Sequence, residues 1–159
     1  MKIQIKILLA LVLNMNLMAD NVDDGLQAYK NKDYIKSEEL WEKACYDGNT
    51  KGCFHLSNLG VLYKNGEGVE QDYNKAKNLW EKACENQDYG GGGGCYNLGR
   101  MYDIGEGVEQ DFKKAVQYYK KACERENSTG CLKYEAMISI LNKKLEQYAD
   151  DIANKKYKQ

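Results

Sequence analysis

Six cysteines are the residues of this sequence with the clearest capacity for chemistry. They form three pairs along the chain, which are Cys45 and Cys53, Cys84 and Cys95, and Cys123 and Cys131. Two pairs are eight positions apart and the middle pair eleven, with five consecutive glycines inside the segment ACENQDYGGGGGCYNLG. Thiols spaced in this way can form disulfides, bind a metal ion or exchange electrons.

The spacing disfavours two of these three chemistries. Structural zinc sites use pairs of cysteines with two to four residues between them. Redox dithiols use C-x-x-C, and attached haem needs C-x-x-C-H. Neither motif occurs in the sequence. We therefore predict no metal and no cofactor, and favour structural disulfides formed in an oxidising compartment.

A repeat explains where the cysteines lie. Residues 60–84 align without a gap with residues 99–123 at a shift of 39, and the heptad GEGVEQD is identical in both. A partial third copy precedes them, because LWEKAC occurs at 40–45 and again at 79–84. Periods of this length are typical of helical solenoids, in which each unit buries its apolar face against its neighbours.

Each unit is predicted to contain two helices joined by a glycine loop. Asp72 and Asp111 stand where the second helices need an N-cap. The paired glycines of the GEGV loops can adopt positive φ without a steric penalty. Gly60 and Gly99 fall inside the first helices, where glycine costs about 1 kcal/mol relative to alanine. Their recurrence indicates a close approach between helices.

The pattern LGxxYxxGxGVxxDxxKAxxxWxKAC occurs at 59–84 and, with Tyr119 in place of the tryptophan, at 98–123. It resembles the Sel1-like repeats, relatives of the tetratricopeptide repeats. With a cysteine pair in each unit, the chain is similar to the secreted Helicobacter cysteine-rich protein family. The resemblance implies an all-α fold, a right-handed α-solenoid of helix-turn-helix repeats cross-linked by disulfides. The glycine run has no counterpart in the pattern.

The repeat also favours one disulfide pairing. Six cysteines permit 15 pairings, but a bond within each pair joins the second helix of one unit to the first helix of the next. In the chain-entropy model, closing such short loops stabilises the fold by roughly 2.5 to 3 kcal/mol per bond. We predict this sequential pairing for all three bonds.

No catalytic residue can be assigned from the sequence. The family resemblance implies penicillin binding and a weak β-lactamase activity, and a serine β-lactamase needs S-x-x-K. None of the four serines has a lysine three residues later. His55 is the only histidine, so it cannot build a multi-histidine zinc centre, and we expect a packing or surface role for it.

Recurring tyrosines and asparagines are the candidates for ligand binding. Tyr63 and Tyr102 repeat between the units, and Asn58 and Asn97 each precede the repeated glycine by two residues. We predict that these four residues line a concave groove for a protein, a peptide or a peptidoglycan-like ligand, with β-lactams as a further possibility. The alternative is that the tyrosines are packing residues, and both interpretations stay open at this point.

The first 19 residues have the layout of a signal peptide, with Lys2 and Lys6 before an apolar run at 7–13 and Ala19 at the expected cut. That run is too short to span a bilayer, and we expect a periplasmic or secreted protein without a membrane span. Removal of the signal peptide would remove Lys2 and Lys6, which leaves 21 basic and 24 acidic residues. No basic face for nucleic acid is indicated.

The predicted domains are a signal peptide at 1–19, an array of about three units at 20–131 and a C-terminal capping helix at 132–159. Leu141, Leu145 and Tyr148 recur at helical intervals in that last segment. A helix that binds a partner is the alternative to a cap. We expect a binding scaffold, with a weak β-lactam hydrolase and a structural adaptor with two surfaces as the alternatives.

Overall fold

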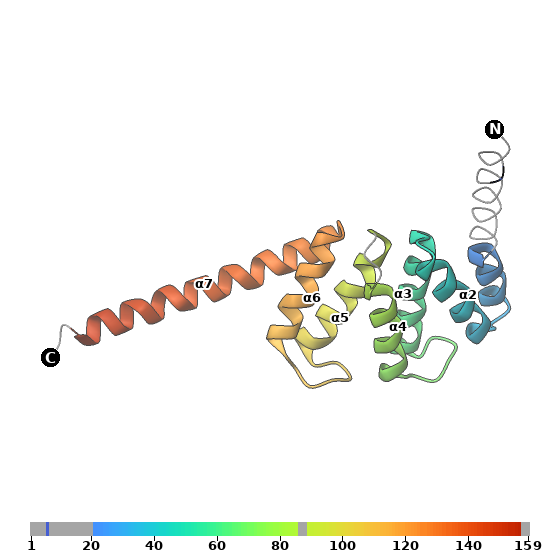
Figure 1. Ribbon diagram of the computed structural model, residues 1–159. Coiled ribbons are helices and arrows are strands. Elements are labelled where there is room, and N and C mark those ends of the chain that lie inside the picture. Colours follow the sequence, from blue (N-terminus) through green and yellow to red (C-terminus); the bar gives the residue numbers. More distant parts are fainter. Residues whose placement is uncertain (1–5, 7–20, 86–88, 157–159) are drawn as a thin grey trace.

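The computed structural model describes residue 6, residues 21–85 and residues 89–156, so the predicted signal peptide lies almost entirely outside the described residues. The described chain is helical throughout apart from its connecting loops, which confirms the predicted all-α fold (Figure 1). Residues 21–30 form a helix. The following elements are α2 (Tyr34–Tyr46), α3 (Thr50–Asn65), α4 (Tyr73–Glu85), the 3-10 turn η1 (Tyr89–Gly91), α5 (Gly92–Ile104), α6 (Phe112–Glu124) and α7 (Ser128–Lys156).

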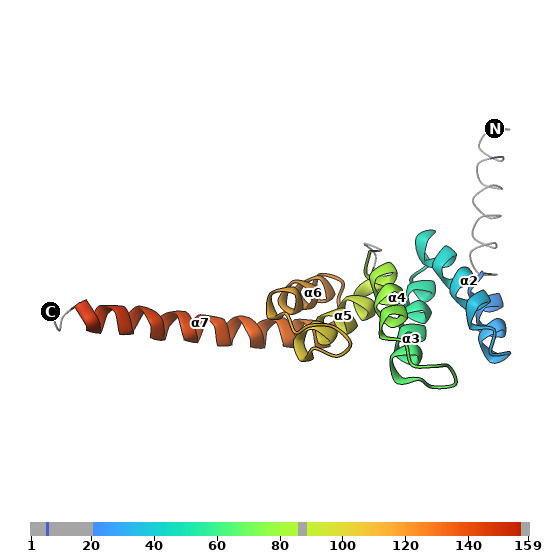
Figure 2. The same ribbon diagram turned by 90° about the horizontal axis from the view of Figure 1, so that it is seen from below.

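The helices pair in chain order into stacked units. Residues 21–30 pair with α2, α3 pairs with α4, and α5 pairs with α6, as Figures 1 and 2 show. We call residues 21–30, α3, α5 and α7 the first helices, and α2, α4 and α6 the second helices. The first helices α3 and α5 contact each other more extensively than the second helices α2 and α4 do. The stack is therefore tighter on the side of the first helices.

An aromatic ring lying against a glycine forms the centre of each unit. A Cβ added to the glycine would lie only 2.4 to 2.6 Å from the ring, so no larger residue fits. The three pairs are Gly25 with Trp41, Gly60 with Trp80, and Gly99 with Tyr119. All three rings are buried. The helix-breaking tendency of Gly60 and Gly99 is thus offset by the close approach that the sequence predicts.

The polar atom of each ring is also satisfied inside its unit. The indole Nε1 of Trp41 donates to the carbonyl oxygen of Val22 at 3.2 Å, and that of Trp80 donates to the carbonyl oxygen of Ser57 at 2.9 Å. Both acceptors lie three residues before the glycine. Tyr119 instead donates from its hydroxyl to Asp103 Oδ2 at 3.1 Å. A buried aromatic with a polar atom needs such a partner.

The GEGVEQD loops have the predicted backbone conformation. All four loop glycines have positive φ, between 70° and 78°. Asp72 and Asp111 accept from the backbone N–H three residues later, which confirms both N-caps. Gln71 and Gln110, for which no role was predicted, donate from their side chains to a carbonyl oxygen in the last turn of the preceding helix, at 2.8 and 2.7 Å. These bonds close the loop onto the end of the first helix.

The three disulfides join the cysteines in the predicted sequential pairs, with Cα–Cα distances of 4.3 to 4.8 Å. A glycine precedes the second cysteine of every pair, and an alanine precedes the first. A Cβ on that glycine would lie 2.6 to 2.8 Å from the alanine Cβ. The pairs of small residues are Ala44 with Gly52, Ala83 with Gly94, and Ala122 with Gly130. Two small residues thus let the helices approach to disulfide distance.

The glycine run packs closely against its neighbours. A Cβ on Gly90 would lie 2.5 Å from the carbonyl oxygen of Thr50, at the start of α3. A Cβ on Gly92 would lie 3.0 Å from the carbonyl oxygen of Arg125, just after α6. At Gly90 and Gly92 the run therefore lies directly against backbone atoms, which leave no room there for a side chain.

The helix α7 starts at Ser128, four residues before the expected boundary, and Asn127 Oδ1 accepts from the N–H of Gly130 at 2.8 Å. Tyr134 and Met137 pack against the buried cluster that contains Tyr119. From Ser139 to Asn154 every residue is exposed, and the helix projects away from the array (Figures 1 and 2). Only its first turns cover the array. None of the helices in the described part of the chain combines the length and the apolar composition that a membrane span needs.

The sole histidine lies at the contact between the first two units. The His55 ring stacks on Trp41 with a centroid distance of 4.9 Å and an interplanar angle of 19°. Burial, and to a lesser extent the charge of Lys51, lowers the pKa of His55. The folded state therefore disfavours the protonated imidazole, as the expected packing role requires.

Replacing Gly60 by alanine should destabilise the fold by about 1 to 3 kcal/mol, because the new methyl group would overlap Trp80. Urea unfolding of the oxidised protein, followed by circular dichroism, measures this loss. Gly93→Ala is the matched control, since its methyl group would meet only the side chain of Ser57, with the hydroxyl at 3.3 Å and the Cβ at 3.8 Å. A Gly60→Ala variant as stable as the Gly93→Ala variant would contradict the close contact.

Acidification should destabilise the protein partly through His55. Its pKa is lower in the folded state than in the unfolded chain, so its contribution is present above about pH 6.5 and is lost as the pH falls through the folded pKa. We expect the free energy of unfolding to fall less between pH 7.5 and pH 5 in His55→Phe, which keeps a ring on Trp41. Equal losses in the two proteins would show that His55 is not the responsive group.

Candidate functional site

A cavity of about 270 Å³ lies between the first helices α3 and α5. Residues from both helices line it, together with one residue from the second helix α4 and one from the loop after α5. The lining residues are Val61, Lys64, Asn65, Trp80, Asn97, Arg100, Met101 and Glu106. This wall combines two cations, one carboxylate and two amides over the aromatic centre of the middle unit.

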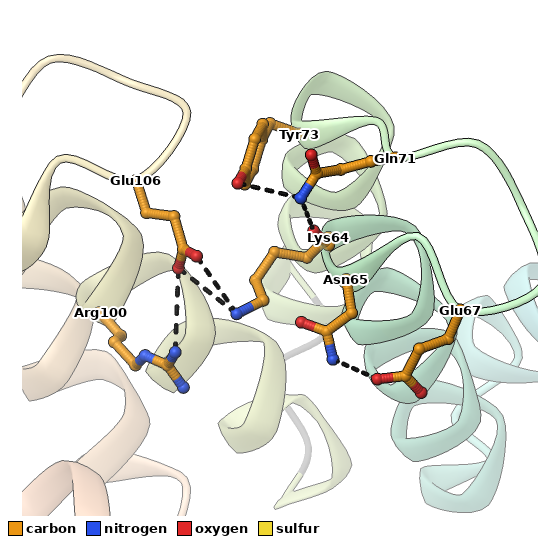
Figure 3. Close-up of polar contacts among 7 residues, drawn as sticks. All are labelled: Lys64, Asn65, Glu67, Gln71, Tyr73, Arg100 and Glu106. Carbon is orange, nitrogen blue, oxygen red and sulfur yellow. Dashed lines mark hydrogen bonds and ion pairs between the residues drawn. The ribbon is translucent and has the colours of Figure 1, made fainter.

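The charges of this cavity converge on one carboxylate. Lys64 Nζ lies 3.4 Å from each carboxylate oxygen of Glu106, and Arg100 Nη2 lies 3.8 Å from Glu106 Oε2 (Figure 3). The Lys64 side chain is only 15% exposed, so its charge is partly removed from water. One carboxylate faces two cations, and the cavity keeps an excess of positive charge.

The amides of the cavity lie close to this cluster. Asn97 Nδ2 donates to Ser57 Oγ at 3.2 Å, which ties α5 to α3. Asn65 Nδ2 donates to Glu67 Oε1 at 2.6 Å, as Figure 3 shows. Each amide also has a carbonyl oxygen that can accept a hydrogen bond. The residues that line the cavity can therefore form hydrogen bonds with both the donors and the acceptors of a peptide-like ligand.

The two cations belong to this junction and not to the repeat. Lys64 lies four residues after Gly60, and Tyr29 takes the matching position after Gly25. Arg100 directly follows Gly99, where Val61 follows Gly60. The preceding junction, between residues 21–30 and α3, has the same fold without these charges. The fold therefore does not require them, which favours a role in binding.

The structure does not bring the four predicted site residues together. Asn97 lines the cavity, and Asn58 is exposed on α3. Tyr63 is half-buried and packs against two of the buried clusters. Tyr102 is 8% exposed. Asn97 and Tyr102 are five positions apart on one helix, so they point in directions roughly 140° apart.

Tyr102 lies on the side of the second helices. Its ring stacks on Tyr118 with a centroid distance of 5.7 Å, and Lys114 Nζ lies 4.9 Å from its centroid. These three residues line a different cavity, of about 390 Å³. A third cavity, of about 610 Å³, lies between α4 and α6, beside Cys84. Neither is shared with Asn97.

Sequence reasoning missed Lys64, Arg100 and Glu106. The sequence does contain a signal for the two cations, because Lys64 and Arg100 are charged where the aligned residues of the other units have a different charge or none. The ion pair between Lys64 and Glu106 was not predictable from the repeat, because the two residues belong to different units. Among the described residues, no group of three or more histidine, cysteine, aspartate and glutamate side chains is placed to hold a metal ion.

Replacing Tyr102 by alanine should destabilise the fold by roughly 3 kcal/mol, because a buried aromatic side chain is lost. Urea unfolding measures this effect. Tyr46→Ala is the control, since Tyr46 is 89% exposed at the end of α2 and its loss should cost little. Equal stability of the two variants would show that Tyr102 is not a core residue.

Comparisons with known proteins agree with this architecture. The family model for the Sel1 repeat matches residues 15–49, 56–88 and 93–127. The solved structure of Helicobacter pylori cysteine rich protein B (HcpB) is 28% identical, covers 77% of this chain and 92% of that one, and superposes with a TM-score of 0.53. A Sel1 repeat protein from Oxalobacter formigenes, 23% identical, covers 74% of this chain and 46% of that one with a TM-score of 0.54, and shows the fold alone.

Two longer Helicobacter pylori proteins match short segments. "Putative beta-lactamase HcpC" is 47% identical over 47 residues, which cover 30% of this chain and 15% of HcpC. "Putative beta-lactamase HcpE" is 43% identical over 44 residues, which cover 28% of this chain and 12% of HcpE. The matched segments are thus a small part of these relatives. The three family matches cover well over half of the chain, which therefore belongs to the Sel1 repeat family.

Proposed function

We propose that this protein is a disulfide-stabilised binding scaffold whose cavity between α3 and α5 receives a carboxylate-bearing peptide or cell-wall fragment. Sel1 repeats generally mediate protein interactions. The observation that carries the finer proposal is the convergence of Lys64 and Arg100 on one carboxylate, at a junction where the fold requires neither cation.

Glu106 occupies the position that a ligand carboxylate would take. Its side chain comes from the loop after α5, which lets it turn away while the helices stay fixed. Hydrogen bonds between charged groups are stronger than neutral ones, and the low exposure of Lys64 reduces screening by water. A ligand carboxylate that displaces Glu106 would therefore be held by both cations.

The amides would recognise the remainder of such a ligand. Asn97 and Asn65 lie on the same wall as the cations. A peptide has one donor and one acceptor in each backbone unit, and a side-chain amide can pair with both. Proteins, peptides and peptidoglycan stem peptides all present this combination of amide groups and carboxylates.

A location outside the cytoplasm suits this function. Disulfides persist in the periplasm and in secreted proteins, and they are rare in the cytosol. Three disulfides in the described chain and the cysteine-rich Helicobacter relatives are consistent with such a location. The predicted signal peptide at 1–19 would provide the export route, and cell-wall fragments are available in the periplasm.

Calorimetric titration of the oxidised protein with a soluble peptidoglycan stem peptide tests the proposal. We expect Lys64→Gln and Arg100→Gln each to weaken binding about tenfold, because each removes a charged partner of the carboxylate. Glu106→Gln should instead strengthen binding several-fold, since it removes the competing charge. The same peptide with an amidated C-terminus should bind less well than the free acid.

Lys82→Gln is the matched control, because Lys82 is also ion-paired, to Glu42 at 2.7 Å, but lies on α4 away from the cavity. Its variant should bind like the unmodified protein. Stem-peptide binding that is unchanged in Lys64→Gln and Arg100→Gln, or stronger for the amidated peptide, would reject the cavity as the site.

A weak β-lactam hydrolase remains the alternative function. The names of HcpC and HcpE support it, and a penicillin also carries a carboxylate beside an amide. Ser57 is hydrogen-bonded to the cavity wall, since it accepts from the amide of Asn97, and its side chain is buried at 4% exposed. An amide donor does not activate a hydroxyl for attack. Penicillin turnover by the purified oxidised protein, absent from the reduced protein, would favour the hydrolase.

A further inference from the structure

An apolar stripe continues along α7 beyond the repeat array. Its residues recur at alternating intervals of three and four, which are Ile138, Leu141, Leu145, Tyr148 and Ile152. This is the spacing of the a and d positions of a coiled coil, with Ile138, Leu145 and Ile152 at a and the other two at d. The interval is kept without interruption over two heptads.

The same stripe is covered at its start and exposed further along. Tyr134, one step earlier in the series, packs against the cluster around Tyr119. Beyond Ile138 the members are 51 to 66% exposed, at Leu141, Leu145, Tyr148 and Ile152. Single exposed apolar residues need no explanation, but four in one seam on a projecting helix indicate an interface.

The exposed part is too long to be explained by the repeat. The first helix α3 has 16 residues, whereas α7 has 29. Cys53 in α3 and Cys131 in α7 are equivalent positions of the repeat. With these two cysteines aligned, the last residue of α3 corresponds to residue 143 of α7. Leu145, Tyr148 and Ile152 lie beyond it. Even a further second helix, packed on α7 as α4 packs on α3, would leave these three residues uncovered.

We propose that the exposed stripe of α7 pairs with the α7 of a second copy of this chain in an antiparallel coiled coil. In the register centred between residues 146 and 147, Leu145 packs against Tyr148 of the second copy. Leu141 packs against Ile152 of the second copy. Twofold symmetry repeats both contacts, so the interface is self-complementary. Four apolar layers then cover every exposed member of the stripe.

Charge complementarity favours the antiparallel orientation. Lys144 and Asp151 are exposed and seven residues apart, so they border the stripe on the same edge, at g positions. In the antiparallel register, Lys144 faces Asp151 of the second copy, and the symmetry gives this pair twice. The opposite edge brings Asn142 against Ala149, which introduces no like charges.

The other arrangements fit less well. In a parallel coiled coil, Lys144 would face Ala149 of the second copy and lose its ion pair with Asp151. Both arrays would also meet at the same end of the seam. A lipid surface is disfavoured because α7 carries four carboxylates against five lysines and is therefore nearly neutral, whereas helices that bind membrane surfaces are rich in lysine and arginine.

The dimer goes beyond the proposed function and does not depend on it. Because α7 projects away from the array (Figures 1 and 2), an antiparallel seam places the two arrays at opposite ends. The assembly would present two copies of the cavity between α3 and α5, facing separate partners. This is the geometry that a two-surface adaptor requires.

Sedimentation equilibrium of the oxidised full chain, over a concentration series, tests the proposal. The chain should form a dimer that Leu145→Glu abolishes. Lys144→Asp and Asp151→Lys should each raise the dimer dissociation constant about tenfold, because both ion pairs become repulsive. An equimolar mixture of these two variants should form a dimer again, since each charge then meets its opposite in a mixed pair.

Lys143→Asp and Asp150→Lys are the matched controls, because they make the same charge changes at positions facing away from the stripe. Both controls should dimerise like the unmodified chain, and circular dichroism should show that all variants keep their helices. A chain that stays monomeric, a dimer that tolerates Leu145→Glu, or a mixture that fails to restore dimers would overturn the proposal. So would a monomer that binds anionic phospholipid vesicles through α7.

Discussion

The contact between an aromatic ring and a bare glycine backbone sets the spacing of the two helices in every unit. Trp80 lies on Gly60 and donates to the carbonyl oxygen of Ser57, so one side chain fixes both the distance and the rotation of the pair. A ring also lies on Gly25 and on Gly99, although Tyr119 donates to Asp103 and not to a backbone carbonyl. Because a solenoid unit contacts only its neighbours, an error in this spacing would disturb the junctions on either side of that unit.

The disulfides stabilise the junctions between units, where little apolar surface is buried. Each bond joins a second helix to the following first helix, and an alanine and a glycine beside it allow the approach. Short closed loops restrict the unfolded chain, which matters for an array with little core per residue. In the middle unit the glycine run lets the longer loop pass against backbone atoms near Thr50 and Arg125.

The two proposed surfaces depend on residues that differ between equivalent positions of the units. The cations at Lys64 and Arg100 distinguish one junction from its neighbour, and Glu106 draws them together across the units. The proposed dimer surface on α7 is a second such case, since α7 departs from the repeat in its length and in its exposed apolar side chains. A scaffold made of similar units acquires specific surfaces where its repetition is broken.

The sequence by itself determined the helical repeat, the loop glycines, the N-caps and the disulfide pairs, because these depend on contacts between residues close along the chain. Only the tertiary structure decided which side chains share a cavity. Asn97 and Tyr102 recur together in the sequence, yet helical rotation separates them. Lys64 meets Glu106, 42 positions away, because stacked helices place them side by side. A periodic pattern specifies each unit, whereas packing between units specifies the surface.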